Sequence, residues 1–134
     1  MICNTDFLIR DWNPDDLPFI FDSWLDSYAI ACADMSPKVY RKCHHKLIEN
    51  QIEGGAVTLK IACNPHDKTH IFGWICANKD CLHFVYVKSA MRSFGIGKAL
   101  LKEIPILTEY SHRTRSISHL KIKDAFYNPY RFFL

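Results

Sequence analysis

One segment of this sequence has the residue types and spacing of an anion-binding site. It spans residues 87–101 and reads VKSAMRSFGIGKALL, from a predicted strand through a loop into a predicted helix. Unpaired backbone N–H groups at a helix start attract anions, and Gly95 and Gly97 let a ligand approach the backbone without a Cβ in the way. Because Arg92 and Lys98 add positive charge, the segment predicts an anion site. An ordinary loop that leads into a helix is the alternative.

Two common phosphate-binding patterns do not fit this segment. The Walker pattern G-x-x-x-x-G-K-[ST] would align on Gly97 and Lys98, but it requires Gly in place of Arg92 and Ser or Thr in place of Ala99. The dinucleotide pattern G-x-G-x-x-G would require a third glycine in place of Leu100.

The elements around the segment follow from hydrophobic periodicity and turn residues. In chain order we predict a strand at 7–12, helices at about 17–28 and 37–53, strands at 57–61, 70–77 and 81–87, a helix from about 95 to 107, and a strand at 117–122. Pro18 suits only a first turn, so the first regular helix should begin nearer residue 17 than residue 14, and Pro105 should end or kink the third helix. The order β-α-α-β-β-β-α-β predicts a mixed α/β fold in which helices and strands share one core.

Composition restricts the class of protein. The chain has 134 residues, of which 49% are hydrophobic and 23% charged, as expected for one globular domain spanning 1–134. The net charge of +3 is small for a nucleic-acid-binding protein. No apolar run approaches the ~20 residues that cross a bilayer, and the N-terminus has no apolar signal region. We therefore expect a soluble protein of the cytoplasm, without membrane or nucleic-acid partners.

The six residues Arg92-Ser93-Phe94-Gly95-Ile96-Gly97 match R-x-x-G-x-G and resemble the acetyl-CoA pyrophosphate loop of the GNAT superfamily of N-acetyltransferases. In that family the loop follows the fourth strand and opens the third helix, as in the predicted element order. Ser89 departs from the proline that the family often has at this point. The resemblance covers residues 6 to about 127 and implies a GNAT-like fold, with a mixed, mostly antiparallel sheet flanked by helices and a shortened C-terminal tail.

The resemblance also implies acetyl-CoA as cosubstrate and an amine as acceptor, which attacks the thioester directly. Backbone groups near Val85 and Val87 would pair with the pantetheine arm, and the amides between Arg92 and Lys98 would hold the pyrophosphate. The implied cofactor-binding residues are Val85, Val87, Arg92, Ser93, Phe94, Gly95, Ile96, Gly97 and Lys98. The protein would then supply positioning, a route for the amine proton and a donor to the thiolate.

Two residues are candidates for the proton transfers. Ala125-Phe126-Tyr127 resembles the region in which family members carry a tyrosine acid, so Tyr127 is the candidate acid; an aromatic residue that packs on the sheet edge is the alternative. His83 is the candidate base because its ordinary pKa lies near neutrality. A structural histidine is the alternative there, with water accepting the proton instead.

The end of the chain departs from the family pattern. Only seven residues follow Tyr127, too few for the two further strands that many family members place beside the acceptor site. The short form and the ending Tyr127-Asn128-Pro129-Tyr130 resemble small acetyltransferase-like proteins of tailed phages and prophages, which would place the protein in a host cytoplasm or a virion. The alternative function is therefore an inactive structural or interaction protein, such as one of a phage particle. The aromatic residues of 126–133 form either a homodimer or partner surface or a tail packed on its own sheet.

Other polar clusters are given ordinary structural roles. We predict no metal site, because Cys76 and Cys81 lack a second ligand pair at a recognised spacing. The run Cys43-His44-His45 is interpreted as a solvated helix face, since consecutive helical residues point in different directions. A locally basic stretch is interpreted in the same way, with nucleic acid, an acidic partner or the 3′-phosphate of CoA as alternatives. It comprises His112, Arg113, Arg115, His119, Lys121 and Lys123.

Overall fold

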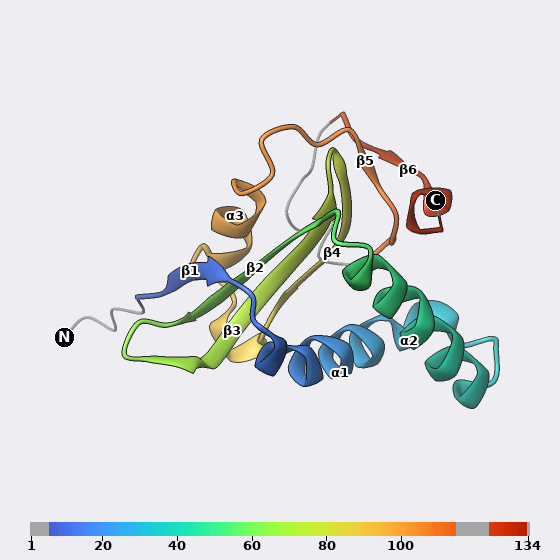
Figure 1. Ribbon diagram of the computed structural model, residues 1–134, viewed down its shortest axis with the longest axis horizontal. Helices are drawn as coiled ribbons and strands as arrows, with labels where there is room; N and C mark the ends of the chain where they lie inside the picture. Colours follow the sequence, from blue (N-terminus) through green and yellow to red (C-terminus); the bar gives the residue numbers. More distant parts are fainter. Residues whose placement is uncertain (1–5, 115–123, 134) are drawn as a thin grey trace.

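The fold is a mixed α/β arrangement built on one six-stranded sheet, as the sequence predicts (Figure 1). A computed structural model describes residues 6–114 and 124–133. The strands lie in the order of the chain and are β1 (Leu8–Asp11), β2 (Val57–Asn64), β3 (Asp67–Asn78), β4 (Cys81–Val87), β5 (Glu109–Tyr110) and β6 (Phe126–Tyr127). Neighbours from β1 to β4 are antiparallel, whereas β5 runs parallel to both β4 and β6. The sheet is therefore mostly antiparallel.

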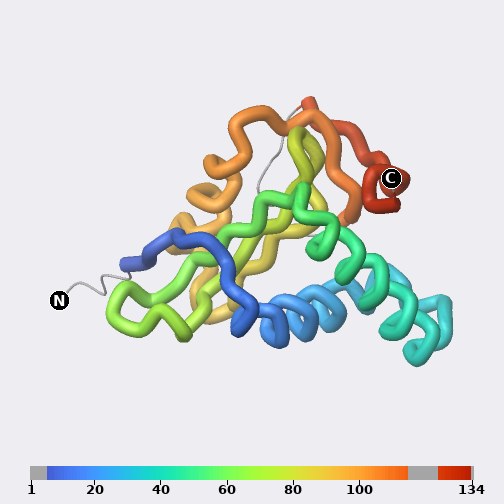
Figure 2. The backbone as a smooth tube through the Cα atoms, viewed as in Figure 1, coloured from blue at the N-terminus to red at the C-terminus, as the bar shows by residue number. Residues whose placement is uncertain are grey.

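Three helices cover the two faces of the sheet. Helices α1 (Leu17–Tyr28) and α2 (Pro37–Glu53) pack on one face, and α3 (Ile96–Leu101) packs on the other, as the tube in Figure 2 also shows. None of the helices in the described residues is long and apolar enough to cross a membrane.

Each face of the sheet has its own hydrophobic core. On the side of α1 and α2, Trp24 is fully buried and its ring lies 5.3 Å from that of Trp74 and 5.2 Å from that of Phe84. On the other side, Ile96 and Leu100 of α3 pack against buried aliphatic residues of β3 and β4. Burial of large apolar side chains on both faces is the main driving force that holds the helices on the sheet.

The 3-10 helix that precedes α1 is fixed by a capping box and a charged pair. Asn13 Oδ1 accepts from the backbone N–H of Asp15 at 3.0 Å, and the Asp16 carboxylate accepts from the backbone N–H of Asn13 at 2.8 Å. Arg10 on β1 donates two hydrogen bonds of 2.8 Å to the same carboxylate. Although burial opposes it, the Arg10 hydrogen bond lowers the pKa of Asp16. Residues 14–16 form a short 3-10 helix, so the prediction that the regular helix begins near residue 17 is confirmed.

The predicted boundaries are wrong after the third helix. Helix α3 ends at Leu101, four residues before Pro105, which was expected to end or kink it, and so before Ile104 and Leu107 of the predicted apolar stripe. The prediction missed β5 and β6, and the predicted strand at 117–122 lies outside the described residues. Strands of two residues are too short to produce a detectable alternation of apolar and polar positions.

A β-bulge interrupts the pairing of β3 with β4. Cys76 pairs with Phe84 and the next residue, Ala77, pairs with Leu82, so His83 is the extra residue of β4. The parallel pairing with β5 stops at Leu82 as well. Within the described part of the chain, the rest of β4 therefore has no strand partner on its β5 side. This edge of β4 borders the cleft described below.

Gly73 on β3 is required by the close approach of β4. A Cβ built on Gly73 would lie 2.4 Å from the carbonyl oxygen of Tyr86, a distance that real Cβ atoms essentially never show. We expect Gly73→Ala to lower the free energy of unfolding by about 1–3 kcal/mol, because β4 must move away from β3. Urea unfolding measures this loss. Gly54→Ala is the control, since Gly54 has an ordinary helical φ of −62°; equal effects at the two positions would contradict the prediction.

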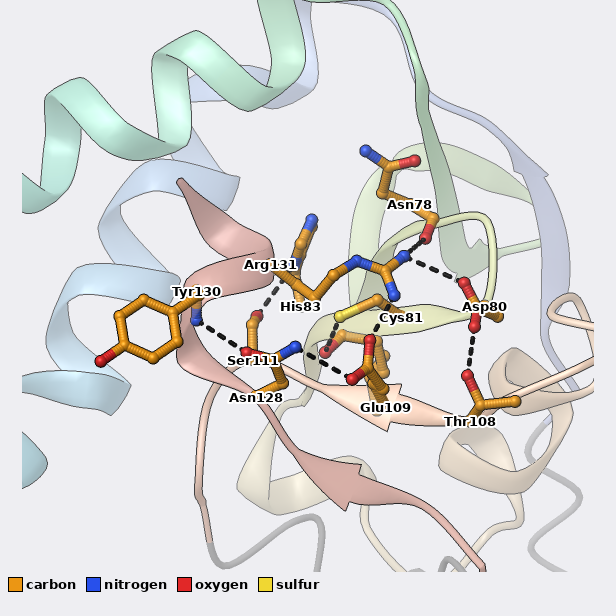
Figure 3. A network of polar contacts seen from close by, with 11 residues as sticks. Asn78, Asp80, Cys81, His83, Thr108, Glu109, Ser111, Asn128, Tyr130 and Arg131 are labelled. Atoms are coloured by element: carbon orange, nitrogen blue, oxygen red, sulfur yellow. Dashed lines mark hydrogen bonds and ion pairs between the residues drawn. The ribbon is translucent and has the colours of Figure 1, made fainter. Parts of the chain in front are cut away.

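The C-terminal segment is fixed by a buried ring and a polar network (Figure 3). Phe132, in the 3-10 helix η4 (Pro129–Phe132), is only 3% exposed and lies within the core on the α1 and α2 side. Arg131 donates to Asp80 at 2.9 Å and also pairs with Glu109. Hydrogen bonds from Thr108, and then from Arg131, lower the pKa of Asp80 to about 2. The tail is thus an integral part of the fold, although Phe126, Tyr130 and Phe133 are exposed.

Candidate functional site

A cleft of about 1030 Å³ opens between the end of α1, the bulged strand β4 and the loop that leads into α3. It brings together residues from four separate parts of the chain. The lining residues are Ser27, Tyr28, Ile30, Ala31, Phe84, Val85, Tyr86, Val87, Met91, Arg92, Ser93, Gly95, Ile96, Gly97, Lys98, Arg113 and Thr114. The size is that of an ordinary small-molecule site.

Two residues in the loop at one end of the cleft have a left-handed backbone conformation. After a short 3-10 helix at Ser89–Met91, Ser93 has a φ of 75° and Gly95 a φ of 84°. A left-handed φ is unstrained only for glycine, which explains Gly95 at the residue before α3. A Cβ at Gly95 would meet no protein atom within 4 Å, so the backbone there is open to a ligand.

Arg92 fastens this loop to the end of β4. Its Nε donates to the carbonyl oxygen of Val87 at 3.1 Å, while the residue also lines the cleft. Of the nine predicted cofactor residues, the cleft brings together eight. The exception is Phe94, an exposed residue at the turn that does not line it.

The opposite end of the cleft is aromatic and carries one cation. The Tyr28 ring lies 6.1 Å from that of Phe84, and the guanidinium of Arg113 lies 4.3 Å from the ring centre of Tyr127. Burial raises the pKa of Tyr28 to about 12; the neighbouring Tyr127 adds to the rise, and the charge of Arg113 opposes it. Tyr28 therefore keeps its proton at neutral pH.

The candidate acid Tyr127 lies near the cleft. It belongs to the edge strand β6 and does not itself line the cleft. Its contact with the cleft lining is through Arg113, whose guanidinium lies over the Tyr127 ring, and Tyr28 is close enough for Tyr127 to raise its pKa. The sequence analysis did not single out Tyr28, because nothing local distinguishes it from a core residue of the helix.

The candidate base His83 is not brought to the cleft. Its side chain is 1% exposed, its Nδ1 lies 2.8 Å from Ser111 Oγ, and its Nε2 has no partner among the described residues. Burial, and then the charge of Arg131, lower the pKa of His83 to about 4. The imidazole is therefore neutral at pH 7, and its surroundings match the structural role that was the alternative.

His83 is one member of a buried relay of histidines that the sequence did not reveal. Ser111 Oγ lies 2.8 Å from His112 Nδ1, and His112 Nε2 lies 3.0 Å from His44 Nε2. Burial lowers the pKa of His44 to about 4 and that of His112 well below its ordinary value. The interpretation of His112 as solvated is therefore wrong, and that of the 43–45 run is wrong only at His44, which is half-buried, since Cys43, His45 and Arg113 are exposed.

No group of three or more His, Cys, Asp or Glu side chains in residues 6–114 and 124–133 is arranged to hold a metal ion. The five cysteines described there are all free thiols. Of the predicted basic stretch, residues 115–123 lie outside the described part.

No protein-family model and no curated protein matches the sequence. Solved structures do match. A possible acetyltransferase from Clostridium difficile 630 is similar at a TM-score of 0.58 and 16% identity over 91% of this chain and 93% of that chain. A GNAT-family acetyltransferase from Staphylococcus aureus Mu50 gives a TM-score of 0.52 and 17% identity over 74% of this chain and 63% of that one.

A third similar structure is a GNAT superfamily phosphinothricin acetyltransferase from Sinorhizobium meliloti, in complex with AcCoA. It gives a TM-score of 0.51 and 21% identity over 73% of this chain and 57% of that chain. The present chain thus spans less than two thirds of two of these three proteins. The order of elements and these likenesses agree: the chain has the fold of the GNAT acetyltransferases.

Proposed function

We propose that this protein is an N-acetyltransferase that uses acetyl-CoA as cosubstrate and an amine as acceptor. One observation carries the proposal: the R-x-x-G-x-G loop lies at one end of a cleft whose wall is an edge of β4 without a strand partner in the described residues. The loop supplies cations and open backbone for a pyrophosphate, and the free strand edge supplies backbone groups for an amide-bearing arm. The fit of eight predicted cofactor residues to one cleft supports it.

In the proposed reaction the uncharged amine attacks the thioester carbonyl of acetyl-CoA. A C–N bond forms and the C–S bond breaks; the amine nitrogen loses a proton and the CoA thiolate gains one. The described lining residues include no His, Asp or Glu, so we propose that water takes the amine proton. His83 is too buried to fill that role in this arrangement.

We propose that Tyr127 and Tyr28 supply the proton to the thiolate. Tyr28 lines the cleft and its raised pKa keeps it protonated, and we propose that the nearby Tyr127 replaces its proton. Tyr127→Phe is expected to lower kcat about a hundredfold while leaving the KM for acetyl-CoA unchanged, because the variant keeps the ring and loses only the hydroxyl. Release of free thiol from acetyl-CoA, with a panel of amines, measures both constants.

The matched control is Tyr130→Phe, which removes a hydroxyl from an exposed tyrosine of the same tail. Wild-type kcat in Tyr127→Phe would contradict the assignment of the acid. Thiol release that does not depend on any amine would contradict acyl transfer itself.

The second candidate function is an interaction protein that uses this fold without catalysis. The observation that favours it is the exposure of three aromatic side chains in the tail, Phe126, Tyr130 and Phe133. Such side chains mark protein-binding surfaces when they are contiguous, for a second copy of the chain or for another protein such as one of a phage particle. A protein that does not bind acetyl-CoA would favour this candidate.

A further inference from the structure

The charged side chains that line the cleft in the described residues are all cationic. They are Arg92, Lys98 and Arg113, and no Asp or Glu lines the cleft beside them. The residues whose structure is not described, 1–5, 115–123 and 134, include no Asp or Glu. An acceptor with several ammonium groups would therefore meet positive charge and no side-chain carboxylate to compensate it.

Arg113 is separate from the cations of the loop. Residues 84–87 of β4 line the cleft. The ring of His112, the neighbour of Arg113, lies 5.7 Å from the ring of Phe84, the first of these residues. The loop is tied to Val87, three residues further along the strand, by the Arg92 hydrogen bond. Three strand residues span about 10 Å. Arg113 thus lies away from the proposed pyrophosphate site, near the place where the arm of the cosubstrate would end.

The position of Arg113 is set by its buried neighbour. His112 is 2% exposed and is held by His44 and Ser111, at 3.0 and 2.8 Å. The guanidinium itself is exposed above the Tyr127 ring, and no described Asp or Glu forms an ion pair with it. A guanidinium stacked on one face keeps its edge free for a planar anion, and it binds carboxylates in a bidentate fashion.

The surroundings of Arg113 are apolar. Tyr28, Ile30, Ala31 and Phe84 line the cleft with it, and Ile30 is 85% exposed. A ligand that covers these side chains would gain from burial of apolar surface.

We propose that the acceptor is an amine that carries a carboxylate beside an aromatic or aliphatic group, as in an apolar amino acid, and that Arg113 binds that carboxylate. This inference rests on the proposed function and names its substrate class. The nitrogen of such an acceptor gains the acetyl group and loses one proton, and the carboxylate takes no part in the bond changes. The acetylated product keeps the same carboxylate and therefore the same contact with Arg113.

The test uses product-like probes, so that it does not depend on turnover. N-acetyl-L-phenylalanine and N-acetyl-L-phenylalaninamide are titrated into the protein by calorimetry, with and without CoA. In the wild type we expect the acid to bind at least tenfold more tightly than the amide, because only the acid offers a charged partner to the guanidinium. In Arg113→Gln the two should bind equally, with the Kd for CoA unchanged.

Lys98→Gln is the matched control, since it removes a cleft cation at the loop end. It should weaken CoA and keep the preference for the acid. Equal binding of acid and amide by the wild type, or a preference that survives in Arg113→Gln, would overturn the inference. A weaker CoA complex in Arg113→Gln would also overturn it, because Arg113 would then bind the cosubstrate. If CoA does not bind at all, the proposed function fails and the acceptor assignment fails with it, while the titrations without CoA still test whether Arg113 binds the carboxylate.

Discussion

Acidification from pH 7 to pH 4 is expected to remove several kcal/mol of stability from this protein. His83 alone should account for about 3 kcal/mol, since its pKa falls from near 6.5 in the unfolded chain to about 4 in the fold. His44 and His112 have pKa values lowered by burial as well, and they add to the same loss. The three imidazoles share one buried relay, so their contributions are not independent.

The direction follows from proton binding. Between pH 6.5 and 4 the unfolded chain binds protons on these histidines and the folded chain does not, so stability falls as the pH falls through this window. The contribution is fully present above the unfolded pKa and is gone below the folded one. The pKa values of Asp16 and Asp80 are also lowered in the fold. Their contribution to the free energy of unfolding is lost only as the pH falls to about 4 and below, because aspartates in the unfolded chain titrate near 4.

Urea unfolding at pH 7, 5.5 and 4.5 measures the effect, and His83→Leu separates it from general acid sensitivity. Leucine removes an imidazole whose Nε2 has no described partner, and Ser111 keeps His112 as its partner. The variant should therefore have a shallower dependence on pH. The control His66→Gln, at an exposed position, should behave like the wild type. Stability that stays constant from pH 7 to 4.5 would show that the relay titrates normally.

Acetyl-CoA at ~100 times its Kd is expected to raise the free energy of unfolding of the wild type by ~2.7 kcal/mol, and Gly97→Asp is expected to abolish this rise. Gly97 lies in the first turn of α3 and lines the cleft. An aspartate there adds both bulk and a negative charge, which repels a pyrophosphate. Thermal unfolding with and without the cosubstrate measures the difference.

Ala90→Asp is the matched control, because it adds the same side chain to an exposed residue of the same loop that does not line the cleft. It should retain the full rise. A wild type that is not stabilised by acetyl-CoA would contradict the proposed function and favour the interaction protein. A rise that persists in Gly97→Asp would place the cosubstrate elsewhere.

Local signals predicted the early elements and the loop well. Asn13 caps the 3-10 helix that precedes α1 and Ser36 caps α2, and such starts can be recognised in the sequence because caps and prolines act over three or four residues. The end of α3 was misjudged, since Ile104 and Leu107 continue the helical spacing. Pro105 has no N–H, and its ring would clash with the carbonyl of Leu101 in a helix. The chain accordingly leaves the helix after Leu101.

Contacts between distant residues could not be predicted from the sequence. His44 and His112 are 68 residues apart, and Arg131 and Asp80 are 51 residues apart. Neither pair belongs to a recognisable motif, because their proximity depends on how helices and strands pack. The same holds for the proximity of Tyr28 to Tyr127, which determines how close Tyr127 lies to the cleft.

The buried ring of Phe132 has a consequence for how the protein is made. It packs against the rings of Trp24 and His112, at 5.6 and 4.5 Å, so residues from near both ends of the chain meet in one core. During synthesis this core lacks that ring until residue 132 has left the ribosome. The aromatic core can therefore close only after the segment from Trp24 to Phe132 has been synthesised and released, so this unit folds as a whole rather than from its first half.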